Sequence, residues 1–383
     1  TFSENRYNET EWGNFAMQNI DLSQALRALT HFMPENAVNG CVPHGNGHIN
    51  GTFMVMSGKK RYILQAINGE VFKNPQQLME NVERVTTFMR KRAVDPRSVL
   101  KILPTPEGKN YFVDENGVAW RMYKFIEDAI CPEHPDAATD IYQCALAFGM
   151  FQRDLHDFPA EELHETIPDF HNTPKRYRDL LEAVGKDPCD RAASVQKEIA
   201  FFRARESFYD TLFAAHRDGK LPLRVTHNDT KCNNVMLDAQ THAALCVIDL
   251  DTVMPGFSVC DFGDAIRFGG NTAAEDEPDV SKVHLDLHFY DIYTRGFVIG
   301  CGGYLEPSEF DLLAAGAKMM TLECGMRFLT DYLMGDVYFK TAYPTHNLVR
   351  CHTQMQLAAD MERNYAKMQE IAGRYRYTQE DAE

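Results

Sequence analysis

The sequence of 383 residues has no long hydrophobic run and no excess of positive charge. No apolar stretch approaches the ~20 residues that a membrane helix needs, and the opening residues do not follow the pattern of a secretory signal peptide. Lysine and arginine number 39 against 55 aspartates and glutamates, which gives a formal net charge of −16. We therefore expect neither nucleic acid nor a membrane as a partner.

The ten cysteines lack the paired spacing of a metal-binding finger or a redox motif, because no C-x-x-C pair occurs. They are scattered along a chain in which 44% of the residues are hydrophobic, which is ample for a large core. We interpret them as reduced and mostly buried thiols. The length indicates one large or two medium domains. Together these features favour a cytoplasmic protein, and we expect it to be a monomer.

The residues that could take part in catalysis concentrate in a polar loop within residues 224–238, with a short apolar run on either side. A polar loop between two strands is typical of a catalytic loop. It contains His227, Asp229 and Asn234. A carboxylate such as Asp229 can orient or accept the proton of an attacking hydroxyl, and an amide five residues later can ligate a metal that bridges phosphates. We expect His227 to hold the loop backbone rather than to transfer protons.

Two aspartates follow this loop, and only one of them suits a metal site. A turn and a second apolar strand, residues 244–248, lead to Asp249, which a hairpin brings back beside the loop. Oxygen ligands from Asn234 and Asp249 suit Mg²⁺. Asp261-Phe262-Gly263 spells the metal-binding tripeptide of protein kinases, but Asp261 lies beyond a Pro-Gly turn, where a helix should start. We interpret Asp261 as a carboxylate that starts the helix or anchors the loop.

Signals for phosphate binding in the first third of the chain are weaker. Gly45 and Gly47 would let backbone amides approach a phosphate closely, although a glycine-rich hairpin turn explains them as well. The G-K-[ST] signature is absent from this segment. Kinases carry a lysine on the third strand, and the candidate position here holds Gln65. Gln65 is either an ordinary strand residue near the nucleotide or a neutral donor to a phosphate. In the second case a metal must supply most of the charge compensation.

The pattern of apolar residues predicts strands between residues 41 and 125 and a helix over residues 75–92. We expect a five-stranded antiparallel sheet, to which residues 100–103 contribute. Tyr123 lies where this sheet ends, near the expected adenine edge of a nucleotide, although a plain strand exit is the simpler interpretation. From residue 139 onward the pattern is mostly helical.

The order of the polar residues resembles a known group of enzymes. His227-x-Asp229-x-x-x-x-Asn234, followed by Ile248-Asp249, is similar to the aminoglycoside phosphotransferase and choline kinase superfamily. Closer likeness, to the N-acetylhexosamine 1-kinase family of bacteria, is found in five longer runs: residues 224–234, 247–256, 261–268, 323–331 and 343–350. The likeness extends from about residue 40 to about residue 368.

This resemblance implies an α+β, protein-kinase-like fold with two lobes. The smaller, nucleotide-covering lobe would span residues 1–125 and the larger, mainly helical lobe residues 126–383. The cofactors would be ATP and Mg²⁺. The substrate would be a small sugar, GlcNAc or GalNAc, phosphorylated at its anomeric hydroxyl with Asp229 as the base.

The resemblance also suggests that His48, Arg327 and Tyr338 line the sugar pocket. The alternative for Arg327 is a salt bridge with Glu323 or Asp331 on the same predicted helix.

Three other functions stay open at this point. The first is a kinase for a cationic small molecule, such as an amino alcohol or an aminoglycoside, which would need an acidic or aromatic cage. The second is a kinase for another neutral sugar. The third is a catalytically silent nucleotide-binding protein, which Gln65 suggests and which the intact Asp229, Asn234 and Asp249 argue against.

Overall fold

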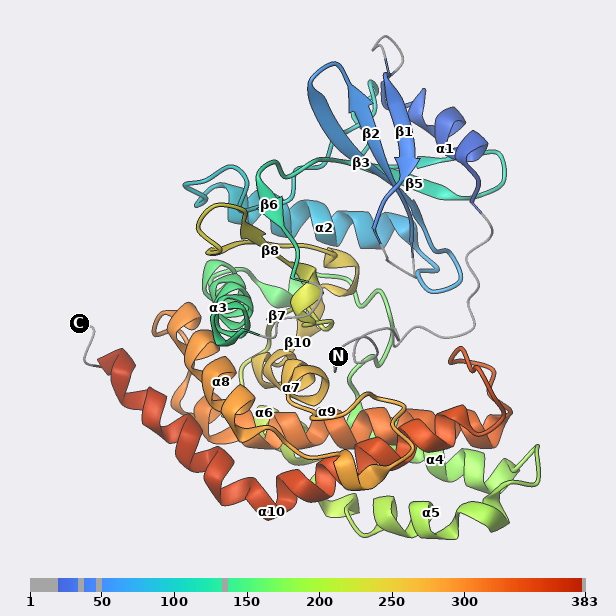
Figure 1. The fold of residues 1–383 in the computed structure, drawn as a ribbon, viewed down its shortest axis with the longest axis vertical. Coiled ribbons are helices and arrows are strands. Elements are labelled where there is room, and N and C mark those ends of the chain that lie inside the picture. Colours follow the sequence, from blue (N-terminus) through green and yellow to red (C-terminus); the bar gives the residue numbers. More distant parts are fainter. Residues whose placement is uncertain (1–19, 34–37, 46–49, 133–136, 381–383) are drawn as a thin grey trace.

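The computed structural model describes residues 20–33, 38–45, 50–132 and 137–380, except for the side chains of residues 377–380. A smaller part built on a β-sheet lies above a larger part made mainly of helices (Figure 1). Helix α2 (Pro75–Arg90) runs between the sheet and the larger part. One apolar core is continuous through both parts, and a second cluster packs the other face of the sheet against α1 (Leu22–Leu29).

The sheet of the smaller part confirms the predicted five antiparallel strands. Their order is β1-β2-β3-β5-β4, and each neighbouring pair is antiparallel. Along β2, buried residues alternate with partly exposed ones, as in a strand with the core on one face. The strands are β1 (Gly40–Pro43), β2 (Gly51–Ser57), β3 (Lys60–Ile67), β4 (Phe112–Val113) and β5 (Ala119–Lys124).

Residues 100–103, which we predicted as part of this sheet, do not form a strand. Ile102 makes only an isolated bridge to Tyr123 of β5. Pro104 follows directly and has no backbone N–H to continue a ladder of hydrogen bonds. The apolar character that suggested a strand reflects burial, because Val99 and Leu100 belong to the main core.

The larger part has eight α-helices within the described residues, and none of them combines the length and apolar character needed to span a membrane. Helix α7 packs so closely on α9 that a Cβ atom added at Gly263 would lie 2.4 Å from the carbonyl oxygen of Gly316. This contact fixes the helix that supports the candidate site. The helices are α3 (Ala138–Asp154), α4 (Thr173–Lys186), α5 (Gln196–Arg203), α6 (Thr211–Arg217), α7 (Ser258–Gly269), α8 (Leu287–Cys301), α9 (Pro307–Met334) and α10 (His346–Glu380).

Two short sheets hold the segment that we predicted to be catalytic. One consists of β7 (Arg224–Thr226) and β10 (Met254–Gly256), and the other of β6 (Ala129–Ile130), β8 (Val235–Asp238) and β9 (Ala244–Val247). All pairs are antiparallel. The polar loop joins β7 to β8, and the chain from β9 to β10 returns beside it.

We propose the predicted division between residues 125 and 126 as the boundary of the two lobes. The sheet of the smaller part ends with Lys124 at the end of β5, and β6, a few residues later, already pairs with β8 of the larger part.

Candidate active site

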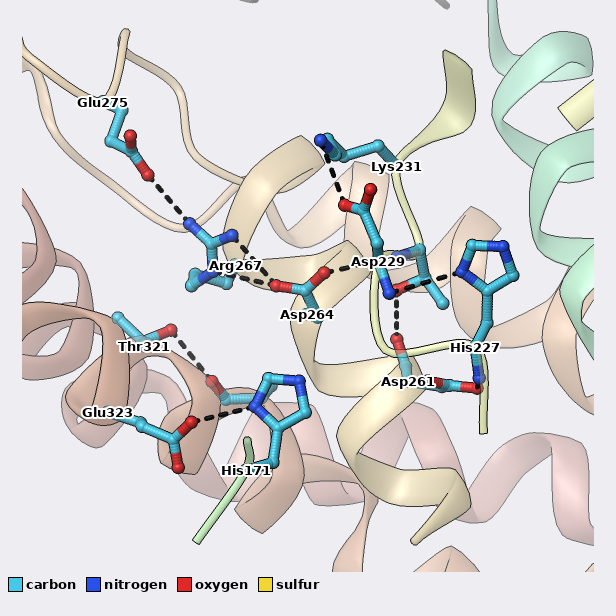
Figure 2. Close-up of polar contacts among 12 residues, drawn as sticks. His171, His227, Asp229, Lys231, Asp261, Asp264, Arg267, Glu275, Thr321 and Glu323 are labelled. Atoms are coloured by element: carbon cyan, nitrogen blue, oxygen red, sulfur yellow. Dashed lines mark hydrogen bonds and ion pairs between the residues drawn. The ribbon is translucent and has the colours of Figure 1, made fainter. Parts of the chain in front are cut away.

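The loop between β7 and β8 is held by a carboxylate in the first turn of α7. Asp261 accepts hydrogen bonds from the backbone N–H groups of His227 and Asn228, both at 2.8 Å (Figure 2). The side chain of Gln152 donates a third, at 3.0 Å. Burial raises the pKa of Asp261, and the two backbone donors act in the opposite direction. A buried carboxylate with three donors is satisfied, so its geometry is that of an anchor for the loop.

A chain of charges continues from the loop along α7. Asp264 accepts a hydrogen bond from the backbone N–H of Thr230 at 3.3 Å and pairs with Arg267 at 2.9 Å. Arg267 in turn reaches Glu275, also at 2.9 Å (Figure 2). Asp264 and Arg267 are buried, and a buried charge without a partner is strongly destabilising. The chain therefore ties the loop to the segment that follows α7.

His227 connects the loop to the end of β9. Its ring lies between Phe148 and Phe151 of α3, with centroids 5.4 and 5.9 Å away. Its Nε2 atom is 2.9 Å from the carbonyl oxygen of Ile248, and its Nδ1 atom is 3.3 Å from the backbone nitrogen of Asp229. The carbonyl can only accept and the N–H can only donate, so we infer a proton on Nε2. Both ring nitrogens are then engaged in holding the backbone.

Asp229 lies in the middle of the loop and is 3% exposed. Its Oδ1 atom is 3.0 Å from the Nζ atom of Lys231, and its Oδ2 atom accepts a hydrogen bond from Nδ2 of Asn234 at 3.0 Å. The same nitrogen donates to the backbone carbonyl of Asp229 at 2.9 Å. The amide nitrogen of Asn234 thus holds the loop, and its side-chain oxygen is the atom that can ligate a cation.

Asp249 follows β9 in the left-handed conformation, with φ 58° and ψ 60°. This conformation is unfavourable for residues other than glycine and is concentrated at functional sites. Burial, together with the nearby carboxylates of Asp251 and Asp229, raises the pKa of Asp249 to about 7. Within the described part of the chain no N–H or O–H group donates a hydrogen bond to this carboxylate. Its surroundings therefore hold a surplus of negative charge.

The donor set around Asp249 fits Mg²⁺. No three histidine, cysteine, aspartate or glutamate side chains of the described residues form a complete metal cage. Mg²⁺ needs none, because it keeps several waters and is bound through one or two carboxylates together with substrate phosphates. A cation between Asp249 and the side-chain oxygen of Asn234 would relieve the repulsion that raises the pKa of Asp249.

The neutral Gln65 of β3 has a positively charged neighbour on the adjacent strand. Gln65 of β3 lies directly opposite Arg121 of β5. Its Oε1 atom accepts a hydrogen bond from Nε of Arg121 at 3.0 Å, and its Nε2 atom donates to Thr52 at 3.0 Å. Arg121 forms a two-pronged ion pair with Asp251. Our sequence reasoning missed Arg121, and a lone charge in the middle of an apolar strand was the available signal.

The other residues predicted near the nucleotide are placed as follows. Gly45 adopts a φ of +76°, which glycine tolerates best. Gly47 and His48 lie outside the described residues. The ring of Tyr123 is buried, with its centroid 5.2 Å from Cζ of Arg121, and burial raises the pKa of its hydroxyl. Tyr123 therefore shares the sheet face of Arg121.

Arg327 of α9 is surrounded by aromatic rings. Its Cζ atom lies 5.8 Å from the ring centroids of Phe170 and Tyr338 and 5.4 Å from that of Phe339. Asp331 accepts hydrogen bonds from the backbone N–H groups of Tyr338 and Phe339, at 2.7 and 2.8 Å. The two residues predicted to share a sugar pocket are thus neighbours, and Asp331 fixes the turn that carries one of them.

A second buried carboxylate, Glu323, lies one turn earlier on α9. It accepts from Nδ1 of His171 at 2.8 Å (Figure 2) and from the hydroxyl of Thr173. Burial alone would raise the pKa of Glu323, but the bond from His171 and the nearby Arg176 hold it below its ordinary value. Burial, and then the charge of Arg327, lower the pKa of Arg176. Two guanidinium groups therefore lie close together beside these aromatic rings.

Comparison with known proteins identifies the family. The family model for APH phosphotransferase enzymes matches residues 40–294, which is well over half of the chain. This chain belongs to the APH phosphotransferase family. The match spans the sheet, the loop between β7 and β8, and α7.

Solved structures of small-molecule phosphotransferases share the fold. A microcompartment-associated aminopropanol kinase is 16% identical, with a TM-score of 0.60 over 91% of this chain and 98% of that chain. An aminoglycoside phosphotransferase from Alicyclobacillus acidocaldarius is 12% identical, with a TM-score of 0.61 over 91% and 96%. Amicoumacin kinase, solved with AMP-PNP and Ca²⁺, is 11% identical, with a TM-score of 0.57 over 88% and 93%. The predicted α+β, kinase-like fold is thereby confirmed.

In this member of the phosphotransferase family the site residues fall into two groups. Asp229, Asn234 and Asp249 come together where the loop meets the end of β9. Arg327 and Tyr338 form a separate group on and after α9. The roles of both groups stay predictions at this point.

Proposed function

We propose that the protein transfers the γ-phosphoryl group of ATP to the anomeric hydroxyl of an N-acetylhexosamine, GlcNAc or GalNAc, and so produces the sugar 1-phosphate. The convergence of Asp229, Asn234 and Asp249 at one end of a braced loop is the observation that carries the proposal. A phosphoryl acceptor needs one carboxylate at its hydroxyl and a metal at the donor phosphates. These three residues provide both from neighbouring positions.

ATP and Mg²⁺ are the proposed cofactors. Amicoumacin kinase was solved with AMP-PNP and Ca²⁺, and a spectinomycin phosphotransferase, another neighbour of the same fold, with ADP. In this chain Asp249 and the side-chain oxygen of Asn234 would hold the Mg²⁺. The metal would neutralise charge on the donor phosphates, which matters in a chain with a net charge of −16.

Asp229 is the proposed base. It accepts the proton of the acceptor hydroxyl as the new oxygen–phosphorus bond forms, while the bond to the bridging oxygen of ATP breaks and ADP leaves. A sugar hydroxyl has a much higher pKa than a carboxylic acid, so this transfer comes late and positioning contributes most of the catalysis. Lys231 and Asn234, each 3.0 Å from one carboxylate oxygen of Asp229, hold it in place.

The positive charges around Arg327, the proposed acceptor-binding residue, support an uncharged sugar over a cationic acceptor. Arg327 and Arg176 lie close enough to lower the pKa of Arg176, and Tyr338 lies beside Arg327. An ammonium group would be repelled there, whereas a guanidinium fork can bind a pair of sugar hydroxyls or an N-acetyl oxygen. This distinguishes the proposal from the activity named for the aminopropanol kinase. We propose Arg327, Tyr338 and His48 as sugar-binding residues on this basis.

We also propose which residues surround the nucleotide, where the protein acts and that it is a monomer. Gly45, Gly47, Gln65 and Tyr123 would lie around the nucleotide, and the protein would act as a cytoplasmic monomer. A silent nucleotide-binding protein is disfavoured, because Asp229, Asn234 and Asp249 are all present and lie together.

The test is the identity of the product. The protein is incubated with ATP, Mg²⁺ and a panel of hexoses, hexosamines and amino alcohols, and products are analysed by mass and phosphorus NMR. We expect an acid-labile, non-reducing sugar 1-phosphate from GlcNAc or GalNAc. Asp229→Asn is the control, which should still bind both substrates while turnover falls by about three orders of magnitude or more.

Two results would contradict the proposal at different levels. A reducing sugar phosphorylated at position 6 would remove the anomeric assignment and keep the kinase. Phosphorylation of amino alcohols alone would remove the sugar assignment.

A further inference from the structure

A buried ion pair joins the N-terminal sheet to residues 249–252, the segment after β9 that begins with the proposed metal ligand Asp249. Arg121, in the middle of β5, is 1% exposed, and Asp251, two residues after Asp249, is 4% exposed. The two terminal guanidinium nitrogens of Arg121 each donate to one oxygen of Asp251, and the bond from Nη2 to Oδ2 is 2.9 Å long. Burial alone would lower the pKa of Arg121, but Asp251, together with Tyr123 and Asp249, raises it above its ordinary value. The pair is therefore charged and dry, a setting in which geometry is strict.

Neighbouring amide side chains fix both members of the pair. Gln65 holds Nε of Arg121 at 3.0 Å. Asn50 donates from Nδ2 to Asp251 at 2.7 Å, and its side-chain oxygen accepts the backbone N–H of Asn68 at 3.0 Å. The network thus draws on three places in the smaller part of the molecule: the start of β2, β3 and β5. It is oriented by hydrogen bonds on both sides.

Thr252, the residue after Asp251, is hydrogen-bonded to the loop between β7 and β8. Thr252 donates its hydroxyl to the carbonyl of His227 at 2.6 Å, and its own carbonyl accepts from Nδ2 of Asn228 at 2.8 Å. Residues 249–252 are therefore held between Arg121 and the loop. Asp249 begins this turn in its unfavourable backbone conformation, so the orientation of its carboxylate depends on what fixes the residues that follow.

Helix α2 occupies the position of the helix that carries the lysine-pairing glutamate in protein kinases. It also bonds to the residue that follows this segment, through Nδ2 of Asn81 to the carbonyl of Val253 at 3.0 Å, but not through a glutamate. Glu80 of α2 binds His164 at 2.6 Å, and Glu83 is exposed. In the described residues a buried ion pair runs from β5 to the segment after β9, and neither Glu80 nor Glu83 of α2 pairs with β3.

We propose that Arg121 is a positioning residue: through Asp251 it fixes the turn that presents Asp249, and so sets the affinity of the site for Mg²⁺ and nucleotide. This rests on the proposed use of ATP and Mg²⁺, but not on which hydroxyl is phosphorylated. Arg121 does not reach the phosphates itself, because its guanidinium is buried and engaged with Asp251 and Gln65.

Removing one partner alone leaves an unpaired buried charge, which destabilises the fold. A loss of Mg²⁺ or nucleotide binding could then not be attributed to the position of Asp249. The main variant is therefore the double replacement Arg121→Met with Asp251→Leu, which removes both charges and keeps similar volume. Arg121→Lys is the second variant, since it keeps the charge but loses the two-pronged geometry. The control is Arg205→Met with Glu362→Leu, which removes a less buried ion pair of 2.7 Å between the segment after α5 and α10.

The measurement is calorimetric binding of AMP-PNP to each variant, with Mg²⁺ and with EDTA, alongside thermal unfolding. We expect the double variant to fold and to bind AMP-PNP in EDTA as the unaltered protein does. The increase in affinity caused by Mg²⁺ should shrink by about tenfold or more, as when a group that orients a metal ligand is removed. Arg121→Lys should give an intermediate loss, and the control pair none.

A full Mg²⁺ effect in both the double variant and Arg121→Lys would overturn the inference and leave the pair a structural element. An equal loss with and without Mg²⁺ would overturn it as well, because Arg121 would then act on the nucleotide rather than on the metal segment. If the double variant does not fold, Arg121→Lys decides alone. If no sugar is phosphorylated but AMP-PNP still binds in a Mg²⁺-dependent way, the proposed acceptor is wrong and this inference still stands.

Discussion

Asp249 and Asp261 are two acids close in the chain, the first half-buried and the second buried, and their polar neighbours differ. Burial raises the pKa of each. Asp261 receives three hydrogen bonds, two of them from backbone N–H groups of the catalytic loop. Asp249 faces the carboxylates of Asp229 and Asp251. Donors stabilise the charge of Asp261 inside the protein, whereas we propose that a bound Mg²⁺ stabilises that of Asp249.

The comparison also explains why a tripeptide motif can mislead. Asp261-Phe262-Gly263 lies within α7. Phe262 is buried against Tyr290 and Phe297, at centroid distances of 5.7 and 5.5 Å. Gly263 permits the close contact with α9. In this chain each of the three residues serves the packing of a helix under the loop, and the strand-end position that would present a metal ligand is occupied by Asp249.

The largest expected effect comes from removing the carboxylate that lacks donors. Asp249→Ala should lower turnover by about three orders of magnitude or more, because the metal that would stabilise transition-state charge loses its carboxylate ligand. The fold should persist, since the change also removes carboxylate repulsion. Steady-state assays over a range of Mg²⁺ concentrations measure the turnover, and thermal unfolding measures whether the fold persists. Turnover close to that of the unaltered protein would show that Asp249 is not the metal ligand.

Asp261→Asn should act mainly on stability. The amide keeps one acceptor oxygen but turns an N–H₂ group toward N–H donors, which leaves buried groups unsatisfied. We expect a loss of about 1–3 kcal/mol in the free energy of unfolding, measured by urea denaturation. The Mg²⁺ concentration for half-maximal turnover should stay unchanged. If Asp261→Asn raises that concentration and Asp249→Ala does not, the two assignments are reversed.

Gln65→Ala has the smallest expected effect. Gln65 bonds to Arg121 and Thr52, which are both protein groups. The change removes a charge-assisted hydrogen bond to Arg121 and a neutral one to Thr52. Neither reaches the nucleotide, so we expect only about 1 kcal/mol of the loss to appear in ATP binding, which lowers the apparent affinity for ATP about fivefold. Turnover at saturating ATP should change little, and titration of initial rates with ATP separates the two. A loss of turnover as large as that of Asp229→Asn would show a role for Gln65 in the transition state.

Local pattern was sufficient for much of the site. The apolar runs around residues 224–238 predicted the flanking strands, and the spacing of Asp229, Asn234 and Asp249 predicted their meeting. Short antiparallel connections determine such neighbours within a few residues. The same method failed at residues 100–103, because burial and strand pairing give the same apolar signal.

The sequence by itself determined the order of strands and helices and the loop that presents Asp229. Only the tertiary structure decided that Arg121 of the sheet pairs with Asp251, two residues after Asp249. Arg121 is 56 residues from Gln65 and 130 from Asp251 in the chain. Their contacts depend on the register of β3 against β5 and on how the sheet packs over the turn after β9. Register is fixed by the hydrophobic faces of whole strands rather than by any single residue, so no local motif could have shown this pair.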